Sequence, residues 1–114
     1  MIDAKEYSLA LSAGRWFIGK LERSTLTDAF ELQIHAQVKG GMLDVQYIAQ
    51  PIGMFPDIDS IAVPDANTYA IADFDKTIQD ALGRALQMGK DIRQSMIAGR
   101  SGIALATTLP RTSP

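Results

Sequence analysis

The sequence predicts an α+β domain in which an antiparallel sheet of hairpins is packed by one long C-terminal helix. Two patterns carry this prediction. Residues 30–50 alternate apolar and polar side chains on both sides of a Gly40-Gly41 pair, which is typical of a β-hairpin with a tight turn. Residues from about 75 to 98 instead repeat apolar side chains at spacings of three and four, which is typical of a helix. At 114 residues the chain can form its own core, so we expect one domain over residues 1–105 and a polar tail over 106–114.

The turn at Gly40-Gly41 predicts the register of this central hairpin. It places apolar residues opposite each other on one face: Val38 with Leu43, Ala36 with Val45, Ile34 with Tyr47, and Leu32 with Ala49. A slip by one residue would move the apolar side chains to the polar face. The pattern therefore specifies the pairing as well as the two strands.

The N-terminal residues 3–13 fit two structures. Asp3 and Glu6 have the spacing of a helix capping box, whereas alternation from Tyr7 onward indicates a strand. The strand is favoured because residues 15–23 are also strand-like and Ala13-Gly14 can turn between the two. The consecutive apolar residues 16–18 predict that this second strand is covered on both faces or lies against a partner chain.

Beyond the central hairpin, residues 52–59 form a loop with unusually many large apolar side chains. Such a loop must lie against its own core or another subunit. Residues 60–63 and 68–72 are strand-like and flank a Pro-Asp-Ala-Asn turn, which predicts a second hairpin.

The C-terminal helix has an apolar stripe that contains small residues. Asp73 or Asp75 can cap its start. The stripe consists of Ile78, Leu82, Ala85, Gly89, Ile92 and Met96. A glycine inside a helix costs about 1 kcal/mol relative to alanine, so Ala85 and Gly89 indicate close approach of another backbone. That backbone belongs either to the sheet or to the same helix of a second copy.

Composition excludes several classes of function. A net charge of −2 with intermixed signs gives no general attraction to nucleic acid. No apolar run approaches the roughly 20 residues of a membrane span, and the N-terminal residues do not have the pattern of a signal peptide, so we expect a cytoplasmic protein. With one histidine and no cysteine, we expect no metal site and no cofactor. No catalytic acid–base pair is evident, so we expect no enzyme activity.

Two functions remain. The first is a small interaction module, such as an inhibitor, an immunity-type protein or an assembly accessory protein, that acts through apolar surface as a homo-oligomer and can bind another protein. Its predicted interface residues are Trp16, Ile52, Met54, Phe55, Ala85 and Gly89. The alternative is binding of a small anionic or nucleotide-like ligand between subunits. Its predicted ligand-binding residues are Arg93, Arg100, His35, Tyr47, Phe55 and Tyr69.

Overall fold

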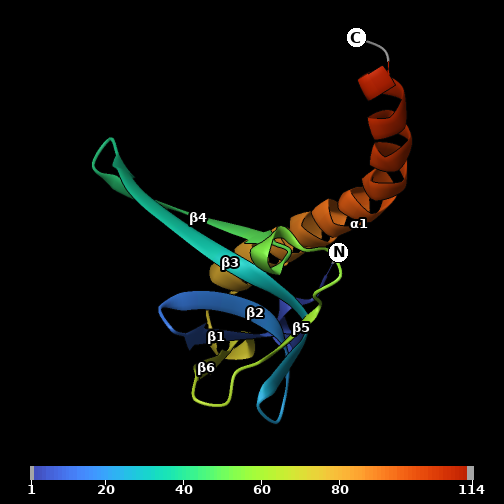
Figure 1. Ribbon diagram of the computed structural model, residues 1–114. Helices are drawn as coiled ribbons and strands as arrows, with labels where there is room; N and C mark the ends of the chain where they lie inside the picture. The colour runs from blue at the N-terminus through green and yellow to red at the C-terminus, as the bar shows by residue number, and fades with distance from the viewer. Residues whose placement is uncertain (1, 113–114) are drawn as a thin grey trace.

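A computed structural model describes residues 2–112, with side chains described as far as Gly99. Six antiparallel strands form one sheet, and one long helix packs against it, which confirms the predicted α+β class (Figure 1). The strands are β1 (Ser8–Ser12), β2 (Arg15–Glu22), β3 (Thr25–Lys39), β4 (Met42–Gln50), β5 (Ser60–Ala62) and β6 (Asn67–Ala70). The helices are α1 (Lys76–Thr112) and three short 3-10 turns, η1 (Ala4–Glu6), η2 (Ile52–Met54) and η3 (Ile71–Asp73).

The strands run in the order β4-β3-β2-β1-β6, and β5 pairs with the start of β3. The predicted second hairpin is therefore wrong, because β5 and β6 pair with β3 and β1 rather than with each other. In a flat sheet, β3, β2 and β1 would lie between β5 and β6, so four spacings of about 4.8 Å, or about 19 Å in all, would separate these two strands. The four residues 63–66 cannot span that distance and also form a turn. The sheet must curl, and Ile61, Val63 and Ala66 turn into the concave face, where they pack with Phe17 and Leu26.

The central hairpin has the predicted register. Val38 lies opposite Leu43 and Leu32 opposite Ala49, and both turn glycines have positive φ, at 57° and 79°. Along the apolar face, however, only Leu32 and Ala49 are buried. The rest of the hairpin extends away from the body of the sheet as an arm (Figure 1).

The apolar run in β2 is covered on both faces by the chain itself. Ile18 belongs to the cluster beneath α1, and Phe17 belongs to the cluster on the concave face. A side chain at Gly19 would come within 2.9 Å of the Thr27 carbonyl oxygen, and the register shifts between Ile18 and Lys20. Glycine therefore permits the β-bulge at which β2 and β3 approach closely.

The N-terminal segment combines the two structures that its sequence fits. Asp3 accepts a hydrogen bond from the Lys5 backbone amide and caps the single turn η1, and β1 begins two residues after that turn. Ala13 and Gly14 form the predicted turn, both with positive φ.

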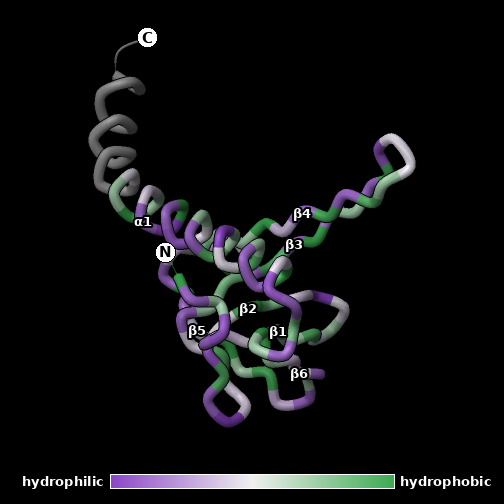
Figure 2. The backbone as a smooth tube through the Cα atoms, turned by 180° about the vertical axis from the view of Figure 1, so that it is seen from behind, coloured by the Kyte–Doolittle hydropathy of each residue, from purple (hydrophilic) through white to green (hydrophobic). Residues whose placement is uncertain are grey.

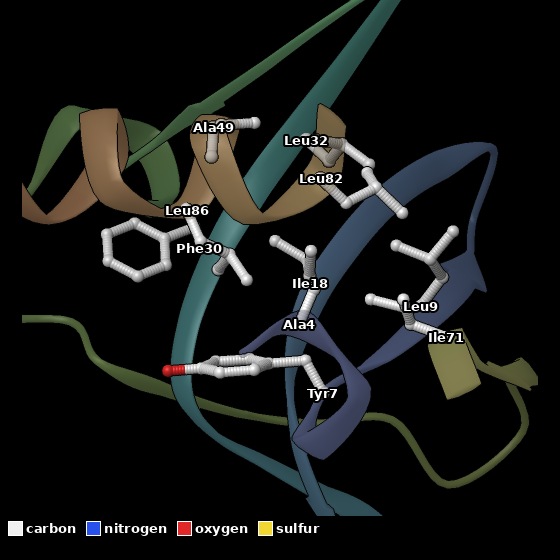
Figure 3. Close-up of a cluster of buried hydrophobic side chains, with 11 residues drawn as sticks. Ala4, Tyr7, Leu9, Ile18, Phe30, Leu32, Ala49, Ile71, Leu82 and Leu86 are labelled. Carbon is white, nitrogen blue, oxygen red and sulfur yellow. The ribbon is translucent and has the colours of Figure 1, made fainter. Parts of the chain in front are cut away.

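Helix α1 begins where Asp75 accepts a hydrogen bond from the Ile78 amide at 3.0 Å. It continues to Thr112, past the predicted end near residue 98 and through most of the predicted tail; residues 113 and 114 of that tail lie outside the described residues. Figure 3 shows Leu86 of α1 beside Phe30 of the sheet and Leu82 beside Leu32. Leu82, Leu86 and Phe30 are fully buried. Within residues 2–112, no helix combines the length and apolarity needed to cross a membrane.

At Gly89, α1 approaches the sheet closely. A Cβ atom there would lie 3.0 Å from Ala49 Cβ, 3.0 Å from Phe30 Cδ1 and 3.2 Å from the Ala49 carbonyl oxygen. The close approach that the small residue predicts is therefore made with the sheet of the same chain.

Gly89→Leu should lower the free energy of unfolding by about 2–3 kcal/mol, because an overpacked contact must displace Ala49 or Phe30. The control is Gly99→Leu, since a Cβ atom at Gly99 meets nothing within 4 Å. Urea unfolding followed by circular dichroism measures both. Equal effects of the two substitutions would contradict the assignment of this contact.

Candidate functional site

The outer half of the central hairpin has an apolar face with no cover from the described chain. Every residue of β3 from Gln33 to Lys39 is exposed. Val38 is 72% exposed, Leu43 68% and the adjacent Met42 75%. Figure 2 shows hydrophobic residues along this arm, away from the body of the sheet. Contiguous exposed apolar surface of this kind makes the arm a candidate interaction site.

A groove of about 470 Å³ lies between β4 and α1, at the root of the arm. It is lined by Val45, Gln46, Tyr47, Ile48, Ala81, Arg84, Ala85 and Met88. Arg84 and Met88 also border an adjoining depression with Gln87 and Asp91, and Met88 is 54% exposed. The groove therefore continues the apolar face of the arm onto the helix.

Strand β4 borders this groove with an unpaired edge. It is the end strand of the sheet, and within residues 2–112 no strand pairs with its outer side. Alternate backbone amides and carbonyls of an end strand point outward and can pair with a strand of another chain.

A polar cluster holds α1 on the sheet behind the groove. The Tyr7 hydroxyl donates to Asp28 Oδ2 at 2.5 Å, and Lys90 Nζ lies 3.0 Å from the same oxygen. Arg93 Nη1 lies 3.8 Å from Asp28 Oδ1. Asp28 has a φ of +48°, a conformation that non-glycine residues rarely adopt, so the cluster offsets a backbone cost near the bulge in β2 and β3.

Arg93 binds the sheet through several groups at once. Its Nη2 atom donates to the carbonyl oxygens of Ala29 and Ile58, and its guanidinium lies 3.9 Å from the centre of the Phe30 ring. Burial lowers the pKa of Arg93, and the charges of Asp28 and Asp59 oppose that shift. Arg93 therefore acts as a clamp within the chain through Nη2, while its buried Nε has no hydrogen-bond partner among the described residues.

The pKa shifts in the cluster follow from these contacts. Burial tends to raise the pKa of Asp28, but hydrogen bonds from Tyr7 and Lys90 outweigh it and lower that pKa. Burial and the Asp28 hydrogen bond raise the pKa of Tyr7. Burial tends to lower the pKa of Lys90, but its bonds to Asp28 and Tyr7 raise it overall. All three groups keep their ordinary ionisation states at neutral pH, as a charge-assisted network requires.

A second ion pair lies where β3 passes from its partner β2 to its partner β4. Arg15 donates to Glu31 through Nε at 3.2 Å and Nη2 at 2.6 Å, and the Gly53 amide also donates to Glu31 at 3.3 Å. The Arg15 hydrogen bonds lower the pKa of Glu31 against the effect of burial. This pair ties η2 to the sheet and fixes the loop that carries Met54 and Phe55.

The six predicted ligand-binding residues lie on different parts of the fold. Tyr47 lines the groove at β4, while Tyr69 of β6 packs against Trp16 of β2, with ring centres 5.9 Å apart. His35 is exposed on the arm and Phe55 is exposed in the loop after η2. Arg93 is engaged in the polar cluster, and the Arg100 side chain lies outside the described residues.

The predicted interface residues divide into two groups. Ile52, Ala85 and Gly89 are buried within the chain, so they are not part of the free surface. Trp16 is half-buried, and Met54 and Phe55 are exposed.

Sequence reasoning missed the four most exposed apolar residues of the arm and groove, which are Val38, Met42, Leu43 and Met88. A signal for them was present in the length of the hairpin. Its apolar face spans residues 32–38, roughly 20 Å at about 3.4 Å per residue, whereas one helix is only about 10 Å wide. A single helix cannot cover a face of that length.

Comparison of the chain with protein families, curated proteins and solved structures finds no match. Within the described residues, no group of three or more histidine, aspartate or glutamate side chains is placed to hold a metal ion.

Tyr7→Phe should lower the free energy of unfolding by about 1.5 kcal/mol, because it removes a hydrogen bond to a charged acceptor. The same substitution combined with Asp28→Asn should cost less, since the acceptor is then neutral. Urea unfolding of the two single variants and the double variant gives the coupling free energy. Strictly additive effects would show that Tyr7 and Asp28 do not stabilise each other.

Proposed function

We propose that the protein is a non-enzymatic interaction module that self-associates through the arm and the groove beside α1. The observation that carries this proposal is the uncovered apolar face of the hairpin from Val38 and Leu43 to Tyr47. This face continues the one that buries Leu32 and Ala49 beneath α1. The chain therefore presents an extension of its own core to solvent.

The energetics of burial support self-association. Full burial of one large apolar side chain contributes roughly 1.5–3 kcal/mol. In a two-fold interface Val38, Leu43 and Met88 each contribute twice, once from each copy. Contributions of that size can exceed the estimated cost of association, about 4–15 kcal/mol.

Internal contacts of Arg93 favour this function over binding of an anionic ligand. An anion would have to compete with Asp28 and with two backbone carbonyls for the guanidinium.

We place the module in the cytoplasm, as an inhibitor, immunity-type or accessory protein. Met54 and Phe55 can contact a second protein, since both side chains remain exposed at the end of η2.

Leu43→Lys should abolish self-association, because it places a charge on the uncovered outer part of the apolar face. The matched control is Gln37→Lys, which adds the same charge at an exposed position on the opposite face of the arm. Light scattering over a range of protein concentrations measures both variants and the unaltered protein. We expect the control to associate like the unaltered chain. An unaltered chain that stays monomeric at high concentration would overturn the proposal.

A further inference from the structure

We infer that the groove is occupied by strand β4 of a second copy, which pairs antiparallel with β4 about a two-fold axis at Val45. The two sheets then join into one continuous sheet. This inference rests on the proposed self-association and adds the pairing strand, its register and the symmetry.

The edge of β4 has almost none of the features that protect sheet edges. Natural proteins block exposed edges with lysine, proline, bulges or very short strands. Strand β4 is nine residues long, and its sequence MLDVQYIAQ contains no lysine, proline or glycine and only one charge, on Asp44. An unprotected edge of this length favours pairing with another strand.

The sequence of β4 is complementary to itself in the proposed register. Antiparallel pairing centred on Val45 places Leu43 opposite Tyr47 on the apolar face, with Val45 opposite its own counterpart. On the other face, Met42 lies opposite Ile48, and Asp44 lies opposite Gln46. No pair brings two charges of the same sign together.

Neighbouring registers are less favourable. Pairing centred on Asp44 would set two carboxylates opposite each other, which is destabilising. Pairing centred on Gln46 or on Tyr47 would place Leu43 or Val45 of the second copy, respectively, beside Ala49. Ala49 is completely buried, and Gly89 of α1 is in close contact with it. A strand centred on Val45 instead occupies the part of the edge that borders the groove.

Self-complementarity identifies the occupant as a second copy. On the face beneath α1, Leu43, Val45 and Tyr47 of β4 each meet another apolar side chain in this register. On the other face, Asp44 meets the uncharged Gln46. The two-fold axis forms each of these pairs twice, except the central pair at Val45.

The tightest contact that Gly89 makes lies away from the two-fold axis. At Gly89, α1 crosses its own sheet over Ala49, four residues from the axis at Val45. At about 3.4 Å per residue, the two crossing points are roughly 27 Å apart, whereas each helix is about 10 Å wide. The helices then flank a floor made of Leu43, Val45 and Tyr47 from both copies.

Cysteine cross-linking tests the register directly, because the chain contains no cysteine. Residues opposite each other in an antiparallel pair have Cα atoms about 4.5–5.5 Å apart, within the range of a disulfide. Val45→Cys should therefore form a covalent dimer under mild oxidation. The control is Ala36→Cys, directly across the hairpin from Val45. Its counterpart in the second copy lies three strand spacings away, about 14 Å, which is too far for a disulfide.

The outcomes separate this inference from the proposed function. A monomeric unaltered protein overturns both. A dimer in which Val45→Cys does not cross-link, or in which only Ala36→Cys does, overturns β4 pairing and leaves self-association intact. Circular dichroism of each reduced variant checks that the cysteine has not unfolded the chain.

Discussion

The packing of Gly89 against Ala49 and Phe30 determines how the rest of the structure divides between core and surface. Because Gly89 has no side chain, α1 crosses the sheet at the root of the central hairpin with almost no space between the backbones. The helix buries Leu32 and Ala49 there, and it leaves the remaining apolar face of the hairpin uncovered. The arm and the groove are both consequences of this one crossing point.

A polar cluster holds the helix at that position. Lys90 and Arg93, three residues apart on α1, both reach Asp28, and Tyr7 donates to the same carboxylate. The cluster joins the N-terminal segment, the bulged strand β3 and the helix. Apolar packing and charge-assisted hydrogen bonds therefore act on the same short part of α1, and the helix has little freedom to slide over the arm.

Most of the apolar surface is used inside the chain. The curled sheet has one cluster under α1 and another on its concave face, and these two clusters contain Ile18, Phe17, Ile52 and Ala85. Because these residues are buried, we propose that association uses the arm and not β2. The unprotected edge of β4 borders that surface.

Local sequence patterns alone determined the hairpin register, the turn glycines and the inward stripe of α1, because each depends on the spacing of neighbouring residues. Sequence reasoning was wrong about the second hairpin, since β5 and β6 find their partners on strands far away in the chain. Only the tertiary structure decided which apolar residues remain exposed. That outcome depends on where a helix about 10 Å wide crosses a longer hairpin, and no local pattern encodes the crossing point.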